Sequence, residues 1–215
     1  MKYVFLGIFV IFTAIHLYAS KKKNQNLRNF SKGFILLSLM AYYTLSTSPI
    51  WVTLIALIFS WLGDIFLIPK GLGWFTAGGI LFLISHAFFI ISYSYTIDFP
   101  NLSLFLIIPV SIIFFVIVSF IMIKLKPYLH KALVIPMGLY LLINGTMNSF
   151  AIFRFASNIN IGTILTLVGA ILFFISDTTL YFVRFKKDSK LKTHFLVMLT
   201  YTLAEFLIVE GLILG

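Results

Sequence analysis

Eight long apolar stretches divide the sequence and are its strongest constraint on the fold. They cover residues 2–19, 33–47, 50–68, 74–95, 101–123, 131–153, 160–183 and 193–214. A helix that crosses the hydrocarbon core of a bilayer needs about 20 predominantly apolar residues. Turn-forming segments such as PKGLG at 69–73 and DFPN at 98–101 separate the stretches. The pattern predicts an all-α, polytopic bundle of eight transmembrane helices that form one transmembrane domain over residues 1–215.

The composition excludes a water-soluble domain. The chain is 61% hydrophobic and 10% charged, whereas soluble domains carry about 25% charged residues. A closed β-barrel is the other structure that spans lipid, but its alternating segments are absent. The apolar run that follows Lys2 could be read as a signal peptide, yet basic residues and further apolar stretches follow it, which favours a first membrane span. The absence of cysteine excludes disulfides and thiolate metal sites.

The distribution of basic residues predicts the orientation in the membrane. Of the 16 Lys and Arg residues, all but Lys2 and Arg154 lie in or beside the first, third, fifth and seventh connections. Basic connections stay on the cytoplasmic side, so both termini are expected outside the cytoplasm, in a bacterial inner membrane. The net charge of +10 lies in short connections between apolar stretches. It therefore predicts contact with membrane lipids and not with nucleic acid. The 14 basic residues in or beside these four connections are Lys21, Lys22, Lys23, Arg28, Lys32, Lys70, Lys124, Lys126, Lys131, Arg184, Lys186, Lys187, Lys190 and Lys192.

Two aspartates interrupt the apolar stretches and are the leading candidates for function. Asp64 lies in FSWLGDIFL (59–67) and Asp177 in LFFISDTTL (172–180). Carboxylates at membrane depth are costly, so each suggests a functional site. Both are expected in the cytoplasmic half, where one wet cavity would accommodate both. An ion pair with a loop lysine is the structural alternative for Asp64. The similarity of the two segments is consistent with a duplicated four-helix unit.

Five further polar residues lie inside the apolar stretches. Tyr201 precedes Glu205 by four residues and Asn144 precedes Asn148 by four, so each pair shares a helix face. His86 and Glu205 suit packing as well as function, and the two asparagines suit helix-to-helix hydrogen bonds. Four glycines are expected to permit close helix packing, namely Gly78, Gly79, Gly162 and Gly169.

Familiar catalytic motifs are missing from the sequence. It contains no HExxH, no GxSxG and no Walker-type glycine loop. Four histidines at different depths make a zinc site a weak hypothesis. Two carboxylates without metal ligands suit general acid and base chemistry better. We therefore predict Asp64 and Asp177 as the catalytic residues, with no metal and no other cofactor.

Several segments resemble a known family. They are GDIFL (63–67), the histidine of SHAFF (85–89), GAILFFISDTTL (169–180) and YTLAEFLI (201–208). Over nearly the full chain the sequence is similar to the YhhN-like lysoplasmalogenases, which are eight-span membrane proteins. The resemblance implies hydrolysis of the vinyl ether of lysoplasmalogens to a fatty aldehyde and glycerophospho-ethanolamine or glycerophospho-choline. It places the two motif aspartates of the family on Asp64 and Asp177. The sequence departs from the family where Phe89 replaces a tyrosine and Glu205 a glutamine.

The chemistry of a vinyl ether suits two buried acids. Protonation of its β-carbon gives an oxocarbenium ion, to which water adds. Desolvation and mutual repulsion divide the roles of two neighbouring carboxyl groups. We expect the deeper Asp177 to be the acid and Asp64 the base, although the reverse assignment stays open. The residues expected to contact the lysophospholipid substrate are His86, Asn144, Asn148, Tyr201 and Glu205.

Two functions of other classes remain alternatives. A proton-coupled transporter or lipid flippase would use Asp64, Asp177 and Glu205 as a relay. Such transporters tend to contain Gly- or Pro-broken helices in both halves, and the third and seventh stretches contain no proline. A metal-dependent lipid amidase is a third possibility, and loss of activity with a chelator would identify it.

Overall fold

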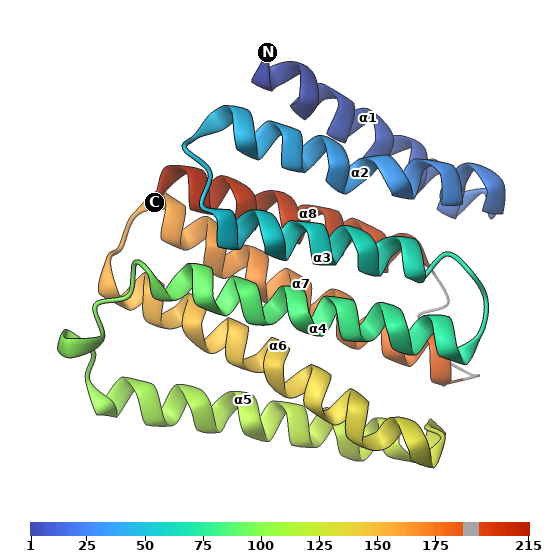
Figure 1. Ribbon diagram of the computed structural model, residues 1–215. Helices are drawn as coiled ribbons and strands as arrows, with labels where there is room; N and C mark the ends of the chain where they lie inside the picture. Colours follow the sequence, from blue (N-terminus) through green and yellow to red (C-terminus); the bar gives the residue numbers. More distant parts are fainter. Residues whose placement is uncertain (187–193) are drawn as a thin grey trace. The chain divides into compact units, whose positions relative to one another are not determined.

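The computed structural model describes residues 1–186 and 194–215, and within them it is built from α-helices, two short 3-10 turns and no strand. The predicted all-α class is therefore confirmed. Figure 1 shows the order of the elements along the chain. The described elements are α1 (Lys2–Lys21), α2 (Gln25–Ser46), α3 (Trp51–Phe66), α4 (Leu72–Ser94), η1 (Phe99–Asn101), α5 (Leu104–Leu125), η2 (Lys126–Tyr128), α6 (Lys131–Ser157), α7 (Ile161–Phe185) and α8 (His194–Leu214).

Six of the described helices are long and apolar enough to cross a membrane, namely α1, α4, α5, α6, α7 and α8. The chain is therefore a multi-pass membrane protein. Helix α3 is apolar but only 16 residues long, and α2 opens with the polar sequence QNLRN. The eight predicted stretches thus correspond to eight helices, of which six meet the length and composition of a span.

The first and sixth connections are shorter than predicted. Helix α2 begins at Gln25 and not near residue 33, because the Asn24 side chain accepts a hydrogen bond from the Leu27 amide at 3.1 Å and caps the helix. Arg28 and Lys32 therefore lie on a helix and not in a loop. Helix α6 likewise continues to Ser157 and includes Arg154. Apolar counting stops at the first charged residues, whereas a helix continues through them. Lys187, Lys190, Lys192 and residue 193, which were predicted to end the seventh connection and begin the eighth span, lie outside the described residues.

The chain divides into two compact units, Met1–Ser92 and Tyr93–Gly215. The first contains α1 to α3 and nearly all of α4, and the second contains α5 to α8. Asp64 lies on the third helix of the first unit, and Asp177 lies on the third α-helix that begins in the second. This division is compatible with a duplicated four-helix unit, and the duplication itself stays a prediction.

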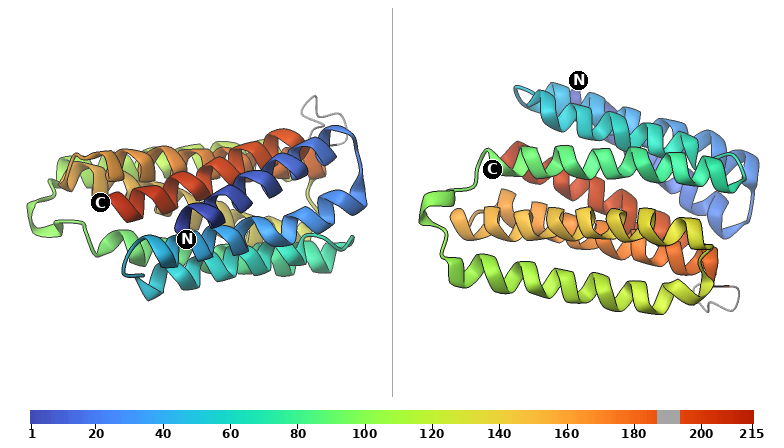
Figure 2. Two further views of the ribbon diagram at one scale, coloured as in Figure 1. Left: turned by 90° about the horizontal axis from the view of Figure 1, so that it is seen from above. Right: turned by 60° about the horizontal axis from the view of Figure 1, so that its bottom comes forward.

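In the first unit, α2 packs against α1 and α3. Figure 2 shows α1 and α2 running alongside each other. Helices α3 and α4 are joined by buried hydroxyl pairs, in which Ser60 bonds Ser85 at 2.8 Å and Thr53 bonds Ser92 at 2.7 Å. Gly63 allows this approach, since a Cβ there would lie 2.7 Å from the Phe82 ring. Asp64, the next residue, is thus held on a closely packed helix.

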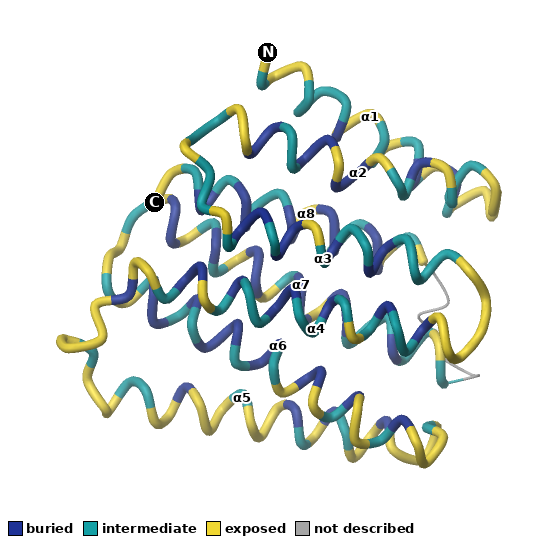
Figure 3. The backbone as a smooth tube through the Cα atoms, viewed as in Figure 1, coloured by how far each residue is buried: buried dark blue, intermediate teal, exposed yellow. Residues whose placement is uncertain are grey.

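In the second unit, α6 packs against α5 and α7, and α7 packs closely along α8. A Cβ at Gly169 would lie 2.9 Å from the Ala204 carbonyl oxygen, and one at Gly162 would lie 2.8 Å from the Gly211 oxygen. Close packing at these two predicted glycines is therefore confirmed. It also holds at Gly78, but Gly79 has nothing within 4 Å of its Cβ position, so that prediction was wrong. Figure 3 shows that much of α5 is exposed, as a lipid-facing helix would be.

Candidate functional site

Asp177 lies at the centre of a buried hydrogen-bond cluster between α6 and α7. The residue is 7% exposed. Its Oδ2 atom accepts a hydrogen bond from the Tyr140 hydroxyl at 2.5 Å and another from Asn144 Nδ2 at 2.7 Å. Both donors project from α6, one turn apart. A buried carboxyl group needs such partners, and here they fix the orientation of the Asp177 side chain.

A stripe on α6 extends this cluster by one more turn. Asn148 Nδ2 donates to the Asn144 backbone oxygen at 3.0 Å and to Asn144 Oδ1 at 3.2 Å. Because Asn144 Oδ1 accepts from Asn148, the Nδ2 atom of the same amide is turned towards Asp177. The predicted shared face of Asn144 and Asn148 is confirmed. Tyr140 was missed, although it lies four residues before Asn144 and continues the same spacing.

Further ionisable groups connect to this cluster inside the second unit. Glu205 on α8 is fully buried, and its carboxyl group interacts electrostatically with the phenols of Tyr140 and Tyr93. Tyr93 also interacts electrostatically with the buried Arg154. The buried polar groups of Asp177, Tyr140, Glu205, Tyr93 and Arg154 therefore belong to one electrostatically coupled region of the second unit.

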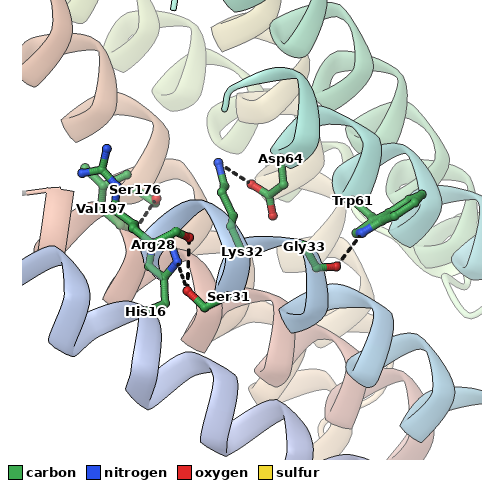
Figure 4. Close-up of polar contacts among 9 residues, drawn as sticks. All are labelled: His16, Arg28, Ser31, Lys32, Gly33, Trp61, Asp64, Ser176 and Val197. Carbon is green, nitrogen blue, oxygen red and sulfur yellow. Dashed lines mark hydrogen bonds and ion pairs between the residues drawn. The ribbon is translucent and has the colours of Figure 1, made fainter. Parts of the chain in front are cut away.

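Asp64 in the first unit is buried in an ion pair. Its Oδ1 atom lies 3.1 Å from Lys32 Nζ, and the side chains of Asp64 and Lys32 are 3% and 13% exposed. Figure 4 shows this pair between α3 and α2. The structural alternative considered for Asp64 is thus realised, with a lysine on α2 in place of a loop lysine. Beside the pair, Trp61 Nε1 donates to the Gly33 carbonyl oxygen at 2.9 Å and fastens the two helices.

A comparison with models of protein families matches residues 27–212 to the YhhN family. The chain belongs to the YhhN family. The suspected resemblance is therefore confirmed over most of the sequence, and the match includes both aspartates and Tyr140. Neither the search of curated proteins nor the search of solved structures found a match.

The other predicted residues of this YhhN family member lie in buried positions. His86 is fully buried on α4, next to Ser85, which bonds Ser60. The ring of Tyr201 packs edge-on against Phe173 of α7 at 5.4 Å. One residue before Asp177, the Ser176 hydroxyl donates to the Val197 carbonyl oxygen at 2.9 Å and ties α7 to α8 (Figure 4).

The predicted residues of the YhhN protein thus fall into two groups, one in each compact unit. Asp64 and His86 belong to the first unit. That both aspartates act on one substrate stays a prediction. Among residues 1–186 and 194–215, no three His, Asp or Glu side chains are grouped so that they could hold a metal ion. The group in the second unit consists of Asn144, Asn148, Asp177, Tyr201 and Glu205.

Proposed function

We propose that this YhhN family protein is a lysoplasmalogenase. It would hydrolyse the vinyl ether of a lysoplasmalogen to a fatty aldehyde and glycerophospho-ethanolamine or glycerophospho-choline. The observation that carries the proposal is the buried Asp177 carboxyl group, one oxygen of which accepts hydrogen bonds from Tyr140 and Asn144. Membership of the YhhN family supports it. No cofactor is part of the proposal.

The reaction begins with a proton transfer to carbon. A vinyl ether resists nucleophiles, but protonation of its β-carbon turns it into an oxocarbenium ion. Water then adds to the cationic carbon and loses a proton, which gives a hemiacetal. The hemiacetal breaks its carbon–oxygen bond to release the aldehyde and the glycerol hydroxyl. One water molecule is consumed, and the enzyme regains the proton that it gave. The protein therefore has to supply an acid and a group that stabilises the cation.

Asp177 is proposed as the acid. Its Oδ2 atom already accepts two hydrogen bonds, so the proton of the acid form is assigned to Oδ1. When this proton leaves, the negative charge that develops on the carboxyl group is stabilised by donors already in place, at no cost of reorganisation. Asn148, through its hydrogen bonds to Asn144, is a positioning residue for this arrangement.

Asp64 is proposed as the carboxylate that stabilises the oxocarbenium ion and accepts a proton from water. Lys32 Nζ lies 3.1 Å from its Oδ1 atom, and an ammonium group at this distance in a buried site strongly stabilises the charged carboxylate. The remaining polar residues are proposed to contact the glycerol or the attacking water. They are His86, Asn144, Asn148, Tyr201 and Glu205.

The test is the release of fatty aldehyde from a lysoplasmalogen by the purified protein and by its Asp64→Asn and Asp177→Asn variants. Loss of a positioned acid or base should lower kcat by about 10²–10⁴-fold. Because both groups serve one reaction, the double variant should be little slower than the slower single variant. An ester-linked lysophospholipid is the control substrate and should release no aldehyde. Near wild-type rates in both single variants would remove the aspartates from catalysis.

A proton-coupled transporter or flippase is the second candidate. It is favoured by the buried Glu205 carboxyl group, which interacts with the phenols of Tyr93 and Tyr140, since intramembrane acids are typical of proton relays. Proteoliposomes with a trapped pH indicator decide between the functions. Proton uptake driven by a lipid gradient, without aldehyde release, would support transport and contradict hydrolysis.

We also propose that all eight helices cross the membrane, with both termini outside the cytoplasm of a bacterial cell. The asymmetric distribution of basic residues supports this orientation. Helix α3, with 16 residues, is about 24 Å long at 1.5 Å per residue. It is shorter than the hydrocarbon core of about 30 Å, so the bilayer would thin around it.

A further inference from the structure

The first unit is strongly basic at one end. Asp64 is the single acidic residue in Met1–Ser92, against seven basic residues. All of these except Lys2 belong to the end at which α1 and α3 finish and α2 and α4 begin. The unit thus contains far more positive charge at this end than Asp64 can neutralise. The six basic residues are Lys21, Lys22, Lys23, Arg28, Lys32 and Lys70.

One of these cations, Lys32, lies next to the proposed catalytic carboxylate, and Arg28 lies one helical turn before it on α2. Lys32 contacts Asp64 at 3.1 Å, and Arg28 precedes Lys32 by four residues, so the two share a face of α2. Lys32 is largely buried and Arg28 is half-buried. Arg28, Lys32 and Asp64 together carry a net charge of +1. Partly buried charges interact strongly, so the three residues are complementary to a ligand with one negative charge.

We propose that Arg28 and Lys32 bind the phosphodiester of a glycerophospholipid. A phosphodiester carries one negative charge and offers two oxygens to donors. An oxygen bound to Lys32 at about 2.8 Å would lie within about 6 Å of Asp64 Oδ1, given the 3.1 Å from Lys32 to Asp64. The three-carbon glycerol backbone spans such a separation. Binding at Lys32 therefore leaves the ether oxygen at the other end of the glycerol within reach of the carboxylate.

This inference rests on the proposed function only for the identity of the substrate. In that function, the bound phosphodiester is that of a lysoplasmalogen. The same chemistry is present in the phospholipids of the surrounding bilayer. The experiment therefore measures binding and not hydrolysis, and it compares the two sources. Its probes are a 1-alkyl lysophosphoethanolamine, which has no vinyl group and cannot react, and the 1-alkylglycerol of the same chain length.

Both probes are titrated into the full-length protein in neutral detergent micelles, and intrinsic tryptophan fluorescence is recorded. Trp61 is a suitable reporter, because its indole donates to Gly33, the residue after Lys32. The wild type should bind the phosphorylated probe at least about tenfold more tightly than the alkylglycerol, which is the effect of one hydrogen bond to a charged group. Lys32→Gln and Arg28→Gln should each weaken binding of the phosphorylated probe about tenfold and leave that of the alkylglycerol unchanged.

Two variants keep this test independent of folding. Arg28→Gln leaves the ion pair between Lys32 and Asp64 in place. Weaker binding of the phosphorylated probe by this variant is therefore not caused by an Asp64 carboxylate that has lost its counterion. Lys2→Gln, at the opposite end of α1, is the matched control and should bind both probes as the wild type does. Equal affinity of the wild type for the two probes, or full discrimination in both Lys32→Gln and Arg28→Gln, would overturn the proposal.

Excess diacyl phosphatidylglycerol identifies the source of the phosphodiester. If it competes with the phosphorylated probe, the site takes bilayer phospholipid, and if it does not, the site takes the single-chain substrate. Both results support a phosphodiester ligand. A wild-type protein that binds the probes as expected but releases no aldehyde from a lysoplasmalogen would leave this site in place and contradict the proposed function alone.

Discussion

The Tyr140 hydroxyl forms the shorter of the two hydrogen bonds to the Asp177 carboxyl group. It donates to Asp177 Oδ2 at 2.5 Å, where charge would develop as the proton leaves. Tyr140→Phe keeps the ring and its edge-on contact with Tyr181 but removes the donor. We expect kcat for aldehyde release to fall about tenfold to a hundredfold, as for loss of a hydrogen bond to a charged group, with little change in KM. Tyr18→Phe, at an exposed position, is the control, and an unchanged kcat in Tyr140→Phe would show that the hydroxyl has no part in the reaction.

The ion pair between Lys32 and Asp64 leads to a second prediction for single residues, which concerns the stability of the fold. Replacement of one partner leaves a buried charge without its counterion, so Lys32→Met should lower the free energy of unfolding by about 3–5 kcal/mol. The double variant Lys32→Met with Asp64→Asn should recover most of this loss, because neither charge remains. Unfolding in detergent, followed by circular dichroism, measures both. A double variant as unstable as Lys32→Met would mean that the lysine stabilises the fold through packing and not through the pair.

At the scale of helices, the contact between α7 and α8 depends on glycine. A Cβ at Gly169 would lie 2.8–2.9 Å from atoms of Ala204 and Ile208, two of which are backbone atoms. Gly169→Ala should therefore force the helices apart and destabilise the protein by about 1–3 kcal/mol. Gly79→Ala is the matched control, because nothing lies within 4 Å of that Cβ position, and it should be neutral or slightly stabilising. Similar melting temperatures for the two variants would contradict the packing explanation.

Arg154 joins three helices of the second unit. It donates to the Thr166 hydroxyl on α7 and to the Gly211 carbonyl oxygen near the end of α8, where a cation also complements the helix dipole. A lysine cannot reproduce the planar set of guanidinium donors. Arg154→Lys should therefore lower the free energy of unfolding by about 1–3 kcal/mol, as is usual for disruption of a buried hydrogen-bond network. Arg184→Lys, at an exposed position, should leave the melting temperature unchanged. Equal stability of both variants would show that charge alone suffices at residue 154.

The helices were predictable because a bilayer requires long apolar stretches, and each predicted stretch contains most of one helix. Helix ends were less predictable. Asn24 caps α2 close to the end of α1, and the charged Arg28 and Lys32 that follow suggested a loop. The stripe of Asn144 and Asn148 was visible in the four-residue spacing, and Tyr140 continues it. Tyrosine is common at membrane interfaces, so this residue was not distinguished from other aromatic residues. The partner of Asp64 was not predictable, because no local spacing connects α2 with α3.

At the scale of the whole molecule, the number of membrane spans can be determined from the side of the membrane on which one connection lies. With eight spans, the segment between α2 and α3 lies outside the cytoplasm. If only the six helices of membrane length and composition cross, this segment lies inside, and the sides of the other connections do not change. The two arrangements therefore differ at Ser48, which lies between α2 and α3.

The chain contains no cysteine, so single cysteines report their own side of the membrane. In intact spheroplasts, a membrane-impermeant thiol reagent should label Ser48→Cys if α2 and α3 cross. Ile159→Cys, between α6 and α7, should be labelled in both arrangements, and Lys22→Cys, after α1, in neither until the membrane is permeabilised. If Ser48→Cys is protected from the reagent while Ile159→Cys is labelled, the protein has six spans and not eight. This result would also place the whole of the connected segment from α2 to α3, with Asp64, on the cytoplasmic side of the membrane, next to the headgroups of the inner leaflet.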